Sequence, residues 1–155
     1  DLHLSLRRQR QMCIRDRFGV KPKVAMLSFS NFGTSSEMRT DRVEEAISIA
    51  RELDPDLIID GPMQADTALV PEIQKEYPFM SFDGPANILI CPNLASANIA
   101  YKLLQRIAGA EMTGPILEGL SKPAHVLQRG DSVRDVVHMA AICAVDAQRH
   151  DWQKL

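Results

Sequence analysis

Short apolar runs alternate along the chain with stretches in which apolar residues recur at helical spacing. Four runs have the length of strands and end at turn residues: 24–29, 57–59, 88–91 and 124–127. The helical spacing predicts four helices, over residues 41–53, 65–70, 94–107 and 133–148. Thr40 and Asn93 are suitable N-caps for the first and third of these helices. Strands that are apolar throughout are sheltered on both faces, so the pattern predicts an α/β fold, with helices on both faces of a parallel or mixed sheet.

The first 17 residues differ from the rest. They hold five arginines and no consistent periodicity, and they lack the apolar stretch and small-residue cleavage site of a secretory signal. Residues 11–17 resemble the translated adapter read-through found at the ends of environmental sequence fragments. We therefore expect residues 1–17 to be a non-native or disordered leader, native sequence to begin near Phe18, and a larger upstream part to be missing.

Composition excludes several classes of function. A net charge of −2 provides no basic field to recruit nucleic acid, and no apolar run approaches the length of about 20 residues that spans a bilayer. The three cysteines stand far apart, which indicates a reducing, cytoplasmic location and no zinc framework. Metal-ligand spacing is absent.

The histidines and aromatic residues form no recognisable catalytic or base-stacking set. His125, His138 and His150 are isolated in the sequence, which favours core or surface roles. Tyr101, Phe79 and Phe82 are too few and too scattered for a base-stacking platform.

Ligands of open parallel sheets bind beyond the carboxyl ends of the strands, and four loops occupy such positions: 30–36, 60–66, 92–98 and 128–135. The first loop offers hydroxyls, an amide and a glycine that could cradle a phosphoryl group: Ser30, Asn31, Gly33, Thr34 and Ser35. It lacks the lysine of a Walker loop and the glycine spacing of a dinucleotide fingerprint. Alternatively, its hydroxyls only cap the following helix.

The second loop places two carboxylates and an amide, Asp60, Asp66 and Gln64, around an expected turn at residues 60–62. They could bind a ligand. Alternatively, Asp60 closes an Asx turn and Asp66 lies in the first turn of a helix, where it favours the helix dipole.

In the last loop, Arg129 precedes a glycine and could present its fork of donors to a phosphate or an oxyanion. Asp135 follows on the first turn of the closing helix. Ser132 and Asp135 also have nearly the spacing of a capping box, which needs no function.

Five segments, in order, resemble the phosphate acetyl/butyryl transferase family: 24–30, 56–66, 91–102, 114–123 and 126–130. Within that family they look closest to the C-terminal, phosphotransacetylase-like region of bacterial hybrid NADP-dependent malic enzymes. The resemblance implies an incomplete two-lobed fold of the isocitrate/isopropylmalate dehydrogenase-like (phosphotransacetylase) kind. Residues 18–115 would form the second lobe, and residues 116–155 would return to a missing first lobe. It also implies a homo-oligomer.

Active relatives move an acetyl group between coenzyme A sulfur and phosphate. The resemblance implies that Asp135 matches the aspartate that takes the thiol proton, and Arg129 the arginine that supports negative charge. Gln128 stands where the family has a serine that positions the thiol. The hybrid malic enzymes share this glutamine, and their rear domain is thought to sense acetyl-CoA rather than turn it over.

Three functions follow from the resemblance. The chain is expected to bind acetyl-CoA as an effector, with NADP and a divalent metal confined to the missing upstream domain. Alternatively, it belongs to an active phosphate acetyltransferase that binds acetyl-CoA or acetyl phosphate, or it is purely an oligomerisation domain. The ligand-binding residues would come from Gln128, Arg129 and the first two loops.

Overall fold

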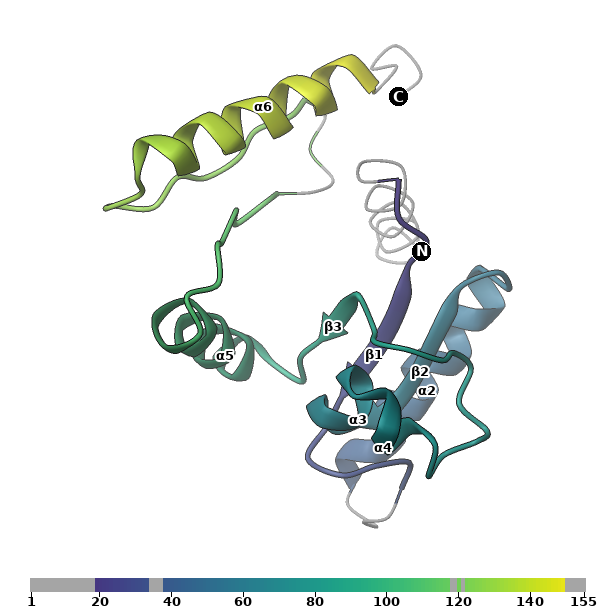
Figure 1. The fold of residues 1–155 in the computed structure, drawn as a ribbon. Helices are drawn as coiled ribbons and strands as arrows, with labels where there is room; N and C mark the ends of the chain where they lie inside the picture. The colour runs from purple at the N-terminus through teal and green to yellow at the C-terminus, as the bar shows by residue number, and fades with distance from the viewer. Residues whose placement is uncertain (1–18, 34–37, 118–119, 121, 150–155) are drawn as a thin grey trace. The chain divides into compact units, whose positions relative to one another are not determined.

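The computed structural model describes residues 19–33, 38–117, 120 and 122–149 (Figure 1). Within these, Val20–Tyr101 forms one compact unit, which we call the sheet unit. The described part of Lys102–Leu155 forms a second, which we call the α6 unit. The lobe boundary expected near residue 115 stays a prediction.

The sheet unit holds three parallel strands, β1 (Lys23–Leu27), β2 (Ile58–Met63) and β3 (Ile88–Ile90). Their order is β2-β1-β3. Helix α2 (Met38–Leu53) links β1 to β2, and the short helices α3 (Ala65–Leu69) and α4 (Pro71–Gln74) lie between β2 and β3 (Figure 1). The parallel sheet and its helices confirm the α/β fold class.

The alternation of side chains along β1 builds a core on each face of the sheet. Val24 packs with Ile47 of α2 and Ile59 of β2, while the next residue, Ala25, packs with Met63 and Ala68 on the opposite face. Helices therefore cover both faces, as the apolar strands predicted. Strand β3 differs, because Leu89 and Ile90 remain more than a third exposed.

The prediction of a turn at residues 60–62 is wrong, because Asp60, Gly61 and Pro62 belong to strand β2. The pairing of β2 with β1 shifts register between Ala25 and Leu27, so these residues form an irregular strand. Gly61 has a φ of 136°, and a Cβ there would lie 2.6 Å from the carbonyl oxygen of Met26. Only a glycine lets the two strands approach so closely.

The first helix begins earlier than predicted. Because α2 starts at Met38, Thr40 lies inside it and is not its N-cap. Asn93 does cap α5 (Leu94–Ile107): its Oδ1 accepts a 2.9 Å hydrogen bond from the Ser96 N–H. The bounds of α5 match the prediction, and α6 (Val133–Arg149) extends one residue beyond it. Helix α4 was not predicted.

The predicted strand at residues 124–127 is also wrong, since no strand forms there. A strand needs a hydrogen-bonding neighbour, and every strand among the described residues belongs to the sheet unit. Val126 and Leu127 are almost half exposed. Among the described residues, no helix is long and apolar enough to cross a membrane.

Candidate functional site

Two of the predicted ligand residues, Asn31 and Gln64, lie side by side where β1 and β2 end. The Gln64 N–H donates to Asn31 Oδ1 at 2.7 Å, and Asn31 Nδ2 donates to Gln64 Oε1 at 3.3 Å. Gln64 Nε2 donates in turn to the carbonyl oxygen of Phe29 at 2.8 Å. The sheet therefore brings the first and second loops together at its carboxyl edge, as parallel strands require.

The rest of the first loop is only partly described. The Oγ of Ser30 is buried and has no hydrogen-bond partner among the described residues, a state that is uncommon in folded proteins. Gly33 is exposed and has a φ of 75°, a left-handed conformation that favours glycine. Thr34 and Ser35 lie outside the described residues.

An aromatic cluster adjoins this loop, formed by Phe32, Tyr77 and Phe79. The ring centroid of Phe32 lies 5.2 Å from that of Tyr77 and 4.8 Å from that of Phe79, and the last two are 6.1 Å apart. The Tyr77 hydroxyl accepts a 3.1 Å hydrogen bond from Asn31 Nδ2. Phe79 is one of the aromatic residues that are scattered in the sequence, but folding brings its ring beside those of Phe32 and Tyr77.

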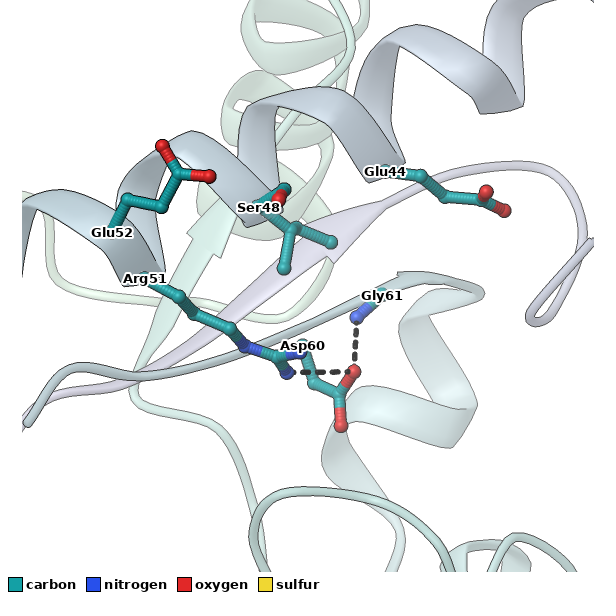
Figure 2. A pocket seen from close by; sticks show the side chains of 7 residues that line it. Glu44, Ser48, Arg51, Glu52, Asp60 and Gly61 are labelled. Carbon is teal, nitrogen blue, oxygen red and sulfur yellow. Dashed lines mark hydrogen bonds and ion pairs between the residues drawn. The ribbon is translucent and has the colours of Figure 1, made fainter. Parts of the chain in front are cut away.

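Asp60 is buried, and internal groups hold its carboxylate (Figure 2). Oδ1 accepts from the Gly61 N–H at 2.9 Å and Oδ2 from the Ser81 N–H at 2.6 Å. The guanidinium of Arg51 lies 3.5 Å from Oδ1 and also donates to the Ile59 carbonyl and the Ser81 hydroxyl. These bonds give Asp60 a structural role in joining β2, α2 and the segment that contains Ser81.

The same carboxylate lines a hollow of about 410 Å³ between α2 and β2. Besides Asp60, Arg51 and Gly61, its lining consists of α2 side chains: Glu44, Ile47, Ser48 and Glu52 (Figure 2). The hollow contains neither Asn31 nor Gln64, so the described structure does not gather all the predicted ligand residues of the sheet unit in one place.

Asp66 is exposed in the first turn of α3, and its Oδ1 accepts a 2.8 Å hydrogen bond from the Thr67 N–H. This geometry is the structural alternative that the sequence left open for Asp66.

In the α6 unit, residues 128–131 form a turn closed by two hydrogen bonds. The Asp131 N–H donates to the Gln128 carbonyl at 3.1 Å, and the Gln128 N–H donates to Asp131 Oδ2 at 2.6 Å. Gly130 takes a φ of 96° within the turn. The Gln128 Oε1 accepts a 3.4 Å bond from Lys102 Nζ. Arg129 is exposed, and its guanidinium forms no hydrogen bond or ion pair with another described residue.

Asp135 forms the capping box that its spacing from Ser132 suggested. Its Oδ2 accepts from the Ser132 N–H at 2.8 Å and from the Ser132 hydroxyl at 2.7 Å, and the Asp135 N–H donates to Ser132 Oγ at 3.2 Å. The side-chain bond from Ser132, followed by the backbone bond, lowers the pKa of Asp135 below its ordinary value, and the nearby His138 and Arg134 act in the same direction.

Asp135 also lines a hollow of about 220 Å³ within the α6 unit. Its other lining residues are Gln105, Ala110, Glu111, Met112, Thr113, Ser132, Arg134 and His138. Arg134 and Glu111 form a bidentate pair at 2.6 and 2.9 Å. Arg129 is not among the lining residues, so the described structure does not bring Arg129 and Asp135 into one hollow.

His125 has a partner that the sequence did not reveal, and its buried side chain agrees with the expected core role. Its Nε2 lies 3.2 Å from Asp146 Oδ2 on α6, and both side chains are almost completely buried. Because Nδ1 accepts from the Leu117 N–H at 3.3 Å, Nε2 is assigned as the donor to Asp146. His125 therefore connects the backbone at Leu117 to Asp146 on α6. Its partner stands 21 residues away, so no local pattern could have revealed it.

Known proteins resemble most of the chain. A curated phosphate acetyltransferase of Acetivibrio thermocellus is 50% identical over 131 residues, which cover 84% of this chain and 40% of that protein. An NADP-dependent malic enzyme of Salmonella typhimurium is 47% identical over 135 residues, covering 85% of this chain and 18% of that protein. The chain therefore spans less than half the length of either relative.

A solved structure shares the fold. The crystal structure of a phosphotransacetylase from Streptococcus pyogenes superposes with a TM-score of 0.82 at 41% identity, covering 90% of this chain and 43% of that one. A sequence model described as phosphate acetyl/butaryl transferase matches residues 12–144. The chain thus belongs to the phosphate acetyl/butaryl transferase family.

Proposed function

We propose that this chain is part of a phosphotransacetylase-like domain that binds acetyl-CoA as an allosteric effector and does not transfer its acetyl group. The parent protein would be an NADP-dependent malic enzyme, with NADP and the divalent metal held by an upstream domain. The observation that carries the proposal is Gln128, which precedes Arg129 where the family resemblance implies a serine.

Acetyl transfer between coenzyme A and phosphate must control a thiol, because the thiolate attacks acetyl phosphate in one direction and leaves the thioester in the other. A serine hydroxyl is small and can both donate and accept a hydrogen bond beside that sulfur. Gln128 offers a bulkier amide, and its Oε1 already accepts from Lys102. The substitution therefore removes a hydroxyl and adds volume where the thiol would lie.

The state of Asp135 supports the same proposal. Hydrogen bonds from Ser132 lower the pKa of this carboxyl group below its ordinary value. Transfer of a proton to it from the coenzyme A thiol is therefore more unfavourable than transfer to an ordinary aspartate. An ionised Asp135 can still cap α6, so its presence does not require catalysis.

Binding of acetyl-CoA requires fewer groups at the site than transfer of its acetyl group does. The exposed guanidinium of Arg129 retains its donors for a phosphate group of coenzyme A. For the ligand to regulate a distant oxidoreductase site, it must bind one state of the assembly more tightly than another. A homo-oligomer would provide such states.

The second candidate is an active phosphate acetyltransferase. The 50% identity with the Acetivibrio thermocellus phosphate acetyltransferase favours it, since identity with the malic enzyme is no higher at 47%. In that case Gln128 would have to position the coenzyme A thiol, the role that the family resemblance gives to a serine at this position.

The full-length parent protein separates these candidates in two measurements. Acetyl phosphate formation from acetyl-CoA and phosphate is expected to be at background, and clear turnover that Asp135→Asn abolishes would establish the enzyme instead. Calorimetry with acetyl-CoA is expected to show binding that Arg129→Ala weakens. No binding heat at millimolar ligand would favour an oligomerisation domain.

The matched variant is Gln128→Ser, which restores the residue that the family resemblance implies. If the amide blocks turnover, this variant should form acetyl phosphate above the wild-type background while still binding acetyl-CoA. Equal background in both proteins, with binding intact, would mean that more than residue 128 prevents the reaction.

A further inference from the structure

Phe79 presents an unusually exposed aromatic ring beside the first loop. The residue is 65% exposed, although its ring packs at 4.8 Å and 78° against Phe32 and at 6.1 Å and 87° against Tyr77. Both contacts are edge-to-face, a favourable geometry for aromatic pairs. With most of its surface open, the ring has an uncovered area available for stacking.

The aromatic cluster is held by backbone hydrogen bonds and is therefore preorganised. The Phe32 N–H donates to the Pro62 carbonyl at 2.7 Å, and the Tyr77 N–H donates to the Gln74 carbonyl at 2.9 Å. The Tyr77 carbonyl in turn accepts from the Met80 N–H at 3.0 Å. A ligand that stacked on Phe79 would not have to order this segment first, which lowers the entropic cost of binding.

Two polar groups at the edge of the aromatic cluster keep hydrogen-bonding capacity. The Tyr77 hydroxyl accepts from Asn31 but donates to no other described residue, so its own hydrogen remains available. Gln64 Nε2 uses one hydrogen on the Phe29 carbonyl and has a second. An apolar face bordered by unused donors suits a flat ring that carries acceptor nitrogens.

Because its ring nitrogens are acceptors and every base has a stacking face, adenine has these properties. Asn31 links the aromatic cluster to the carboxyl edge of β1 and β2, where ligands of parallel sheets bind. We propose that the adenine base of acetyl-CoA stacks on Phe79, with the Tyr77 hydroxyl donating to a ring nitrogen. This inference rests on the proposed function, from which the ligand is taken.

A non-polar side chain of a partner protein is the competing occupant. It would cover Phe79 equally well but would leave the donors of Tyr77 and Gln64 without acceptors, at an energetic cost. The polar border therefore favours the base.

The test is calorimetry on the full-length parent protein with two ligands. Acetyl-CoA carries the nucleotide, whereas acetyl-pantetheine carries the same thioester without it. Phe79→Ala is expected to weaken acetyl-CoA binding by roughly 5- to 150-fold, the loss that removing one base-stacking ring produces, and to leave acetyl-pantetheine binding unchanged. Tyr77→Phe, which keeps the ring, should weaken only acetyl-CoA, by a few-fold.

The matched control is Phe29→Ala. Phe29 is also exposed, at 55%, and lies outside the aromatic cluster, so its loss should change neither affinity. Circular dichroism of each variant checks that it is folded. Unchanged acetyl-CoA affinity in Phe79→Ala, or an equal loss for both ligands, would overturn the adenine site while leaving the proposed function intact. If the wild-type protein binds no acetyl-CoA, the proposed function fails, and this inference fails with it.

Discussion

Replacement of Asp60 by alanine tests whether its carboxylate is a structural anchor rather than a ligand group. The carboxylate satisfies two backbone donors, the N–H groups of Gly61 and Ser81, at 2.9 and 2.6 Å. It also lies 3.5 Å from the guanidinium of Arg51 (Figure 2). Alanine removes all three interactions at once and leaves the rest of β2 in place.

The expected cost can be worked out from these contacts. Each backbone donor left without a partner in a buried position costs about 1–3 kcal/mol. Ser81 is exposed, so water can replace part of its lost bond, and the sum should lie near 2–4 kcal/mol. The side chain of Arg51 is 47% exposed and retains the Ile59 carbonyl, so its ion pair adds less than about 1 kcal/mol.

Urea unfolding of the chain, followed by circular dichroism, measures this loss. A loss near 2–4 kcal/mol is a large fraction of the roughly 5–15 kcal/mol that stabilises a typical domain. The matched control is Asp56→Ala, because Asp56 is exposed and its carboxylate bonds to no other described residue. That variant should stay within about 0.5 kcal/mol of the wild type. The anchoring role is refuted if Asp60→Ala is as stable as the control.

Three further outcomes follow from the structure. Gly61→Ala should destabilise by about 1–3 kcal/mol in the same urea assay, because the new Cβ would lie 2.6 Å from the Met26 carbonyl oxygen; wild-type stability would contradict this. Ser30→Ala removes a buried hydroxyl that has no partner among the described residues, so the melting temperature should hold or rise, and a fall would reveal a further bond. The pKa of Asp135 is lowered on folding, so its bonds to Ser132 stabilise α6 above the unfolded pKa near 3.9 and are lost as pH falls through the folded value. Helicity should therefore decline below about pH 4, and an unchanged decline in Asp135→Asn would exclude this carboxylate as the cause.

The elements that were predicted correctly are those whose signal is local. Helix α5 repeats its apolar residues over fourteen positions and is preceded by Asn93, which caps it, so its bounds could be read directly. The capping box of Ser132 and Asp135 is likewise a spacing rule within one turn of helix. The parallel sheet was predicted from strands that are apolar throughout, in which apolar and polar residues do not alternate.

Several of the failures concern a partner that is distant in sequence. Asp60, Gly61 and Pro62 are turn residues by local statistics, but pairing with β1 makes them part of a strand. The apolar run at residues 124–127 needs a neighbouring strand, and none of the described residues supplies it. The aromatic cluster and the buried link between His125 and Asp146 each join segments more than twenty residues apart.

The proposed loss of turnover and the proposed retention of acetyl-CoA binding are compatible at residues 128–135, because the two depend on different groups. The turn is closed by Asp131, and α6 is capped by Ser132 and Asp135, so the backbone that carries Arg129 is fixed without residue 128 contributing a hydroxyl. A change from serine to glutamine would leave this support intact, since Gln128 enters the turn through its backbone N–H and carbonyl. Arg129 would then still offer its donors to a phosphate while the thiol lost its hydrogen-bonding partner. On this argument a single substitution can convert a transferase site into a sensor site, which is why Gln128→Ser is the most informative change in the chain.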